Sequence, residues 1–351
     1  MIAKALKDPK RNDKILSNIQ SMADNLKELK TDFEQNGCIQ DVFSKADDNR
    51  FRPVSKAYCA VPPRFVYRCL EPEYVIKTIE NDKIRYSRPV NFNDKKDPDL
   101  ASLRNSNRKV FSESAIKAFM DEVEKKKDIS DDDKHKVREN LHSFKSYYDD
   151  IYGNLHICCF TDDVAADSKD DEDSRWAGKQ FRTAALCIES EGIPSLHKIY
   201  YSSKIRMKGK KKRLEKMFIK GRFREFEGFY YDSMADFLAR IYIKQRKYSW
   251  EHEWRSSIIG TLDPECFAIE DDGYAHLYYQ GINEWIRHVI IGCNTSDSDK
   301  AKIITLCEEY GFGFCLMNED YLISPIVGHE TICDNCELRS DRCALAYKSN
   351  K

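Results

Sequence analysis

The stretch that decides the fold is residues 65–87, which read FVYRCLEPEYVIKTIENDKIRYS. Residues 65–70 are rich in β-branched and aromatic side chains, which predicts a strand, and residues 74–80 predict a short helix. Asn81 and Asp82 predict a turn into a second strand over residues 83–87, which Pro89 ends. This segment therefore predicts a domain in which strands and helices follow one another closely.

The rest of the chain continues this alternation irregularly. Further strands are expected at residues 155–160, 184–188, 289–292 and 313–317. Further helices are expected from about residue 225 to 246 and from a cap at Ser296 through Tyr310. Irregular alternation favours an α+β fold with a mixed, largely antiparallel sheet over a regular parallel fold.

Three regions are predicted along the chain. Residues 1–60 form a helical amino-terminal extension, whose apolar stripe is Ile15, Ile19, Met22, Leu26, Leu29 and Phe33. This stripe predicts packing on the chain's own core or on a protein partner. Residues 61–325 form the α+β domain, with a helical insertion at about 101–150 that contains a capping box at Ser130 and Asp133. Residues 326–351 form a cysteine-rich tail.

Composition excludes several classes of protein. Lys and Arg number 58 and Asp and Glu 59, so the formal net charge is −1 and no global field indicates nucleic acid or membrane. The first twenty residues contain no secretory signal, and no apolar run approaches the roughly 18 residues of a membrane span. We therefore expect a cytoplasmic protein that does not bind membranes. The 13 cysteines are an odd number, which argues against a complete disulfide framework, and we expect most of them to be buried thiols.

Residues 247–255, which read KYSWEHEWR, carry the densest group of functional side chains. Read as a strand, the segment places Trp250, His252 and Trp254 on one face, while Glu251, Glu253 and Arg255 share the other. Two acids beside an arginine can have widely separated pKa values, which suits acid/base chemistry. The alternative interpretation is an amphipathic strand with a solvated charged face.

Five pieces of the chain, taken in order, resemble a bacterial family of domains of unknown function, family 2971. They are residues 65–70, residues 84–94 with Asp97, residues 157–161, and residues 250–255 followed by 289–292. The resemblance covers roughly residues 64–318, and it implies a role in bacterial anti-phage defence or as a toxin. Lys95, Lys96 and Lys179 depart from the pattern of the family.

The order of Arg68, Ser87, Glu251 and Glu253 also resembles the Arg–Ser–Glu-x-Glu pattern of ADP-ribosyltransferases. The resemblance implies an effector-type enzyme that transfers ADP-ribose from NAD or hydrolyses NAD. Arg68 would bind the pyrophosphate, Glu253 would stabilise the oxocarbenium character, and Glu251 would activate the acceptor. The substrate-binding side chains expected with this site are Tyr86, Asn93, Asp94, Trp250 and Arg255. Alternatively, Arg68 and Glu253 form a buried ion pair.

Two further functions compete with this one. Asp94 and Asp97 with Glu251 or Glu253 could bind a divalent metal for a metal-dependent nuclease, although Asn and Asp in such a loop usually stabilise a turn. The third class is a non-catalytic module. It would bind a protein through the amino-terminal helix, or nucleic acid through the basic run Lys204–Arg213.

The tail offers the ligands of a structural zinc ion. One imidazole and three thiols lie close together in sequence, at His329, Cys333, Cys336 and Cys343. A CxxC pair with two further soft ligands suits tetrahedral zinc. Free thiols are the alternative, and Cys315 is a substitute ligand if His329 points away.

Overall fold

The computed structural model describes residues 52–89, 92, 112–125, 127, 130–136, 138–139, 141–142, 153, 155–163, 184–202, 238–258, 266–270, 276–317 and 323–324. Among these residues, eight strands form the main sheet in the order β13-β12-β11-β4-β1-β3-β8-β5. In chain order they are β1 (Phe65–Leu70), β3 (His156–Thr161), β4 (Ala184–Glu189), β5 (Leu196–Lys198), β8 (Glu253–Ile258), β11 (Ile286–Gly292), β12 (Gly313–Met317) and β13 (Ile323–Ser324).

Neighbouring strands of the main sheet are antiparallel, except for the parallel pair β11 and β12. A three-stranded antiparallel sheet has the order β2-β10-β9, built from β2 (Lys83–Tyr86), β9 (Phe267–Glu270) and β10 (His276–Gln280). A parallel pair joins β6 (Tyr200–Ser202) to β7 (Ile243–Gln245). The predicted α+β class with a mixed, mostly antiparallel sheet is confirmed.

The strand–helix–strand segment predicted at residues 65–87 forms β1, α5 (Pro72–Glu80) and β2. The helix begins two residues before the predicted Tyr74, at Pro72, because proline is favoured in the first turn, where its missing N–H costs nothing. Asp82 turns the chain with a left-handed φ of 50°. Ser87, predicted to end β2, instead pairs with Ile157 of β3 through two backbone hydrogen bonds of 2.9 Å.

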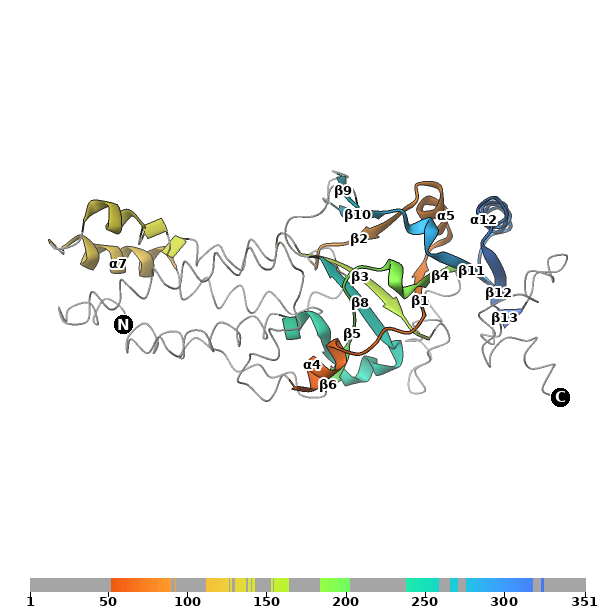
Figure 1. The fold of residues 1–351 in the computed structure, drawn as a ribbon, viewed down its shortest axis with the longest axis horizontal. Coiled ribbons are helices and arrows are strands. Elements are labelled where there is room, and N and C mark those ends of the chain that lie inside the picture. Colours follow the sequence, from red (N-terminus) through yellow and green to blue (C-terminus); the bar gives the residue numbers. More distant parts are fainter. Residues whose placement is uncertain are drawn as a thin grey trace.

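The two faces of the main sheet are covered by different elements (Figure 1). On one face lie α5, α12 (Asp297–Tyr310) and the β2-β10-β9 sheet. Their buried apolar side chains form one core with this face, and examples are Val75, Ile79, Ile84, Leu277 and Ile303. On the other face lie β6 and α4 (Arg52–Tyr58), which belongs to the predicted extension. Tyr58 stacks on His197 of β5 with ring centroids 3.6 Å apart, so α4 packs directly on the sheet.

The carboxy-terminal unit β11–α12–β12 forms as predicted. The Ser296 hydroxyl accepts a hydrogen bond from the Asp299 N–H at 3.1 Å and caps α12. Gly311 ends the helix in a left-handed conformation, with φ of 74°. Of the nine described cysteines, Cys158, Cys187, Cys307 and Cys315 are buried and Cys59 and Cys293 are exposed, so the prediction that most are buried is not confirmed.

Two predicted elements are wrong. Residues 247–255 do not form one strand, because η6 (Arg246–Glu251) is a 3-10 helix and His252 adopts a left-handed φ of 47° before β8 begins at Glu253. The helix predicted to run to residue 246 ends at residue 242, where β7 follows. The backbone break at His252 gives the segment before it a different orientation from the strand that follows.

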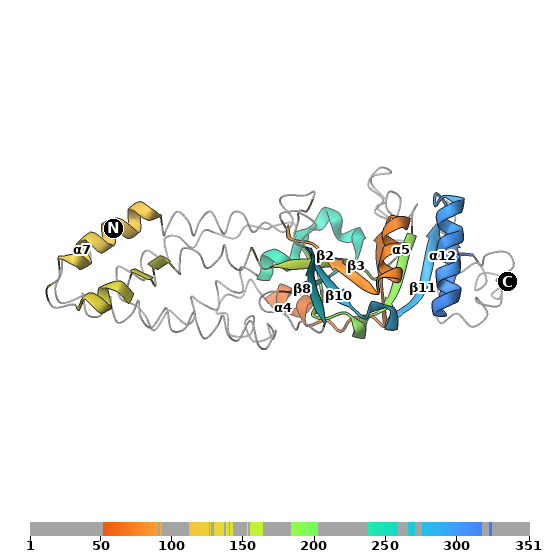
Figure 2. The ribbon, with the colours of Figure 1, turned by 90° about the horizontal axis from the view of Figure 1, so that it is seen from above.

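The predicted helical insertion is described in part. It contains α7 (Glu113–Glu124), which lies at one end of the molecule, away from the sheets, in both views (Figures 1 and 2). The N-cap half of the predicted capping box is confirmed, since the Asp133 N–H donates to the Ser130 hydroxyl at 3.1 Å, and this hydroxyl donates to the Asp133 carboxylate at 2.7 Å. Residues 1–51, the run 204–213 and the tail 326–351 lie outside the described residues. None of the described helices is both long and apolar enough to cross a membrane.

Candidate functional site

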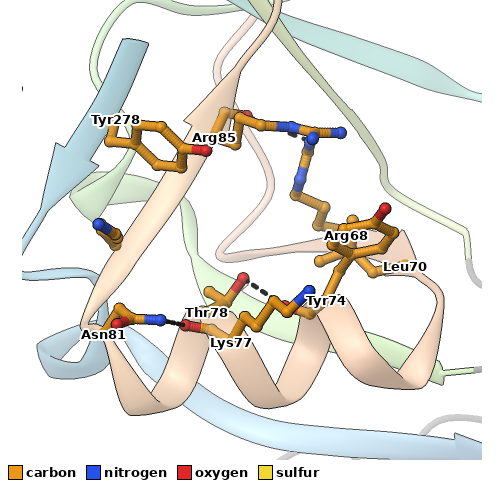
Figure 3. A pocket seen from close by; sticks show the side chains of 9 residues that line it. Arg68, Leu70, Tyr74, Lys77, Thr78, Asn81, Arg85 and Tyr278 are labelled. Carbon is orange, nitrogen blue, oxygen red and sulfur yellow. Dashed lines mark hydrogen bonds between the residues drawn. The ribbon is translucent and has the colours of Figure 1, made fainter. Parts of the chain in front are cut away.

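A pocket of about 410 Å³ lies between α5, β1, β2 and β10 (Figure 3). This volume falls in the range of roughly 300–1,000 Å³ that is typical of small-molecule sites. The lining side chains are Arg68, Leu70, Tyr74, Lys77, Thr78, Asn81, Lys83, Arg85 and Tyr278. Most of them come from the single strand–helix–strand segment, and β10 completes the pocket because it pairs with β2.

Helix α5 presents a polar stripe to the pocket. Tyr74, Lys77, Thr78 and Asn81 follow one another at spacings of three, one and three residues, so they share one face of the helix. The stripe is braced along the helix, because the Thr78 hydroxyl donates to the Tyr74 carbonyl at 2.7 Å. The Asn81 amide likewise donates to the Lys77 carbonyl at 2.7 Å. The opposite face of α5 is apolar and packs into the core.

Strand β2 sends its cations to the same pocket. Alternation along the strand points Lys83 and Arg85 toward the pocket, while Ile84 and Tyr86 at the intervening positions are fully buried. Tyr278 of β10 is directly opposite Arg85 in the register, so the two side chains lie on the same face of the small sheet. The pairing of two strands thus brings an aromatic ring beside a guanidinium group.

The pocket is strongly positive. Arg68, Lys77, Lys83 and Arg85 all line it, and none of the nine described lining residues carries a carboxylate. The Glu73 carboxylate lies 3.6 Å from the Lys77 ammonium, but both side chains are about 60% exposed, so solvent screens this pair. Several cations held around one concave surface favour an anionic ligand.

The guanidinium group of Arg68 is fixed in place by neutral groups. Its Nη1 donates to the Cys158 Sγ at 2.7 Å and to the Cys159 carbonyl at 3.0 Å, and its Nη2 donates to the Arg85 carbonyl at 3.2 Å. Its buried Nε has no hydrogen-bond partner among the described residues. Burial raises the pKa of the Cys158 thiol to about 11 although Arg68 opposes the rise, so Cys158 is uncharged at neutral pH and does not neutralise Arg68.

Two aromatic rings border the cations. Tyr74 is 38% exposed, and its ring centroid lies 5.2 Å from the Lys77 Nζ and 5.4 Å from the Arg85 Cζ. The Tyr278 ring centroid lies 4.9 Å from the Lys83 Nζ. Because Tyr74 comes from α5 and Tyr278 from β10, the rings stand on different sides of the pocket (Figure 3). Flat faces next to cations can hold a planar ligand group.

A second cluster of charged side chains lies around the start of β8. The Lys244 ammonium contacts both the Glu251 carboxylate and the Glu253 carboxylate, the latter at 2.9 Å. The Arg255 Nε donates to the other oxygen of Glu253 at 2.6 Å. The side chain of Glu253 is only 2% exposed and that of Arg255 only 1%. This is a buried ion-pair network rather than an open site.

The two acids of this network ionise differently. Burial opposes the ionisation of Glu253, but Arg255 and Lys244 outweigh it and hold its pKa well below the usual range. Burial raises the pKa of Glu251, and the Glu253 charge adds to the rise while Lys244 opposes it. Such a divergence is typical of acid/base pairs in active sites, but structural ion-pair networks also produce it.

The site implied by the ADP-ribosyltransferase resemblance would bring Arg68, Ser87 and Glu253 into one open cleft, and this expectation is wrong. In the register of β1, β3 and β8, Tyr67 is opposite Thr161 and Thr161 is opposite Glu253. Residues directly opposite one another share a face, so Glu253 lies on the face of Tyr67 and Arg68 lies on the other. The buried ion pair expected as the alternative therefore does not form between Arg68 and Glu253. Glu253 pairs with Arg255 and Lys244 instead.

The other predicted substrate-binding residues are dispersed. Tyr86 is fully buried and its hydroxyl is 2.9 Å from that of Ser256, so its ring is not available to a ligand. Trp250 belongs to the 3-10 helix η6 and is half-buried, and Arg255 is committed to Glu253. Ser87 is part of the bridge to Ile157. Of the predicted set, the structure places Arg68 in the pocket.

Several predicted ligands fall outside the described residues. These are Asn93, Asp94 and Asp97 of the loop and His329, Cys333, Cys336 and Cys343 of the tail. Within the described part of the chain, no group of three or more His, Cys, Asp or Glu side chains could bind a metal ion. Glu251 and Glu253, the described members of the proposed nuclease site, are both bound by Lys244.

Sequence reasoning missed Tyr74, Lys77, Lys83, Arg85 and Tyr278. A signal for the cations existed, because Arg68 and the three missed cations occur within residues 65–87. The same segment contains four acids, and the sequence does not show that they point away from the pocket. Tyr278 is far away in sequence and enters through strand pairing. Comparisons of the chain with protein-family models, curated proteins and solved structures found no match.

Proposed function

We propose that this chain binds a phosphate-bearing small molecule in the pocket between α5, β1, β2 and β10. One observation carries the proposal. Four cationic side chains and no carboxylate are found among the nine described residues that line a pocket of about 410 Å³. An anionic ligand would complement these cations, and the function supported best is recognition of such a ligand rather than chemistry by Glu253.

The arrangement of Arg68 favours phosphate over a weakly charged ligand. Its contacts are with a neutral thiol and two carbonyl groups, so its positive charge is oriented but not compensated by them. Arginine and lysine form charge-assisted hydrogen bonds with phosphate oxygens, and these are stronger than bonds between neutral groups. Because the guanidinium is already held, little side-chain entropy is lost when a ligand binds.

Calorimetric titration of the full chain with pyrophosphate, sulfate and NAD tests the proposal. We expect pyrophosphate to bind, and we expect Arg85→Ala to weaken binding at least about tenfold, which is roughly 1.4 kcal/mol. The matched control is Arg287→Ala, because Arg287 pairs with Glu189 on the surface away from the pocket. If no phosphate-bearing compound binds, or if Arg85→Ala behaves like the control, the proposal is wrong.

A more specific proposal is that the chain is an effector enzyme that transfers ADP-ribose from NAD or hydrolyses NAD. One observation favours it, since Arg68, the cation expected to bind the pyrophosphate, lines the pocket. The position of Glu253 on the other face gives it no support as the carboxylate of this reaction. Incubation with NAD and measurement of free nicotinamide tests the reaction, and NAD that binds without nicotinamide release would restrict the function to recognition.

A further inference from the structure

We propose that the ligand is a free nucleotide with at least two phosphates, whose base lies against Tyr74 and whose phosphates contact Arg68 and Arg85. This inference rests on the proposed function and narrows its ligand class. It is carried by the distance between ring and cations, by the charge of the pocket and by the pocket's size.

An exposed aromatic ring stands at the edge of the cationic pocket. Large apolar side chains that are exposed in the described part of the chain are Val61, Tyr74 and Tyr310. Of these, Tyr74 lines the pocket. Stacking on an aromatic ring increases the affinity for a nucleotide whatever its base, since every base has a flat face. The exposure of Tyr74 is thus explained if a planar group covers it in the bound state.

The ring and the cations lie within reach of one nucleotide. The Arg85 Cζ is 5.4 Å from the Tyr74 ring centroid, and the Arg68 Nη2 is 3.2 Å from the Arg85 carbonyl oxygen. A ligand that contacts Tyr74 and both arginines therefore needs a flat group and an anionic group only a few bonds apart. A nucleoside phosphate has this form, whereas an inorganic anion uses the cations and leaves the ring uncovered.

The charge of the pocket favours more than one phosphate. Arg68, Arg85 and Lys77 together carry about three positive charges, of which Glu73 offsets a part at Lys77. A terminal phosphate carries about −1.5 to −2 at neutral pH, and an additional bridging phosphate adds about one negative charge. A diphosphate therefore matches the pocket better than a monophosphate does.

The form of the pocket favours a free ligand over a nucleic acid strand. Its volume of about 410 Å³ lies near the lower end of the range for small-molecule sites. Proteins that bind single strands without sequence preference use grooves that follow the backbone over about 4–16 nucleotides. A single pocket of this volume provides one binding position instead.

Calorimetric titrations of the full chain with ADP, AMP, adenosine, pyrophosphate and a single-stranded oligonucleotide test the inference. We expect ADP to bind more tightly than pyrophosphate or AMP, and we expect no measurable binding of adenosine. Tyr74→Leu should weaken ADP binding roughly 5- to 150-fold, the loss expected for one base–aromatic stack. The same variant should leave pyrophosphate binding unchanged. Tyr310→Leu is the matched control, because Tyr310 is exposed outside the pocket and stacks on Phe312.

The outcomes separate this inference from the proposal on which it rests. If pyrophosphate binds as tightly as ADP and Tyr74→Leu changes neither affinity, the nucleotide inference is overturned while the anion pocket stands. If the oligonucleotide binds more tightly than ADP in an Arg85-dependent manner, the assignment to a free nucleotide is overturned. If neither ADP nor pyrophosphate binds to a chain whose thermal unfolding is normal, both proposals are overturned.

Discussion

Arg68 and Glu253 lie on opposite faces of the main sheet, although only one strand separates β1 from β8. This relationship divides the charged side chains into two groups with different surroundings. Arg68 faces a pocket with other cations, while Glu253 is enclosed with Lys244 and Arg255. The cations of the pocket can bind an anionic ligand, whereas the charged side chains around Glu253 are paired with one another.

Glu253→Ala should destabilise the fold without changing ligand affinity. Removal of this carboxylate leaves the fully buried Arg255 without its 2.6 Å partner, and breaking a buried ion pair in this way typically costs about 3–5 kcal/mol. Chemical denaturation measures the cost, and titration with pyrophosphate at low temperature measures the affinity. Glu189→Ala is the control, since its partners Arg64 and Arg287 are exposed and the change should cost about 1 kcal/mol or less. Lost affinity with normal stability would instead assign Glu253 to the ligand site.

Added salt should weaken ligand binding. The lysines of the pocket and Arg85 act through charge, and the Debye length falls from about 10 Å at 0.1 M salt to about 3 Å at 1 M. We expect pyrophosphate affinity to fall steadily with sodium chloride concentration, and to fall less steeply in Lys83→Ala. Calorimetry over a salt series measures both slopes, with thermal unfolding at each salt as the control for folding. Equal slopes for the two proteins would show that Lys83 takes no part.

The parts of the fold that could be predicted from sequence are those with local signals. The segment at residues 65–87 and the unit from β11 to β12 both contain a helix with a recognisable start and a turn. The break at His252 could not be predicted, because a left-handed φ at a residue other than glycine has no reliable local signal. Alternating Trp and Glu residues fit a continuous strand equally well, so the sequence alone does not distinguish the 3-10 helix η6 from a continuation of β8.

Of the nine described residues that line the candidate site, the sequence predicted Arg68 alone as a site residue. Alternation within a strand can be read from sequence, but the relative register of β1, β3 and β8 depends on pairing between segments about 90 residues apart. A shift of one residue in either pairing would have placed Arg68 and Glu253 on the same face. The same limit applies to Tyr278, which reaches Arg85 through the pairing of β10 with β2.

Ser296→Ala should destabilise the protein by about 1 kcal/mol, the usual cost of removing an N-cap side chain. Its hydroxyl accepts the Asp299 N–H, and α12 packs Ile303 and Leu306 into the core, so loosening the first turn reduces the stability of that packing. Denaturant unfolding measures the effect. Thr305→Ala is the matched control, because Thr305 is exposed within the helix and bonds only along it, to the Ala301 carbonyl. A cost for Ser296→Ala no larger than that of the control would show that the cap is dispensable.

Acid should lower the unfolding free energy of the protein through His197, which joins α4 to the sheet. The His197 Nδ1 donates to the Tyr58 carbonyl at 2.9 Å, and burial lowers the pKa of His197 to about 4 although this hydrogen bond opposes the shift. Above about pH 6.5 the imidazole is neutral in both the folded and the unfolded chain, so its contribution to stability is complete. As the pH falls from about 6.5 to about 4, the unfolded chain takes up a proton that the folded chain does not, and up to roughly 3 kcal/mol of unfolding free energy is lost.

The difference in unfolding free energy between the wild type and His197→Gln isolates this effect, because His288, whose pKa burial also lowers to about 4, titrates in both proteins. We expect that difference to shrink steadily between pH 7 and pH 4, as denaturant unfolding at a series of pH values would measure. The direction follows from proton binding alone, since the stacked ring loses its neutral form only when the protein unfolds or when the pH passes below about 4. A difference that stays constant over this range would mean that His197 is protonated as easily in the folded chain as in water, and that the stack on Tyr58 opens readily to solvent.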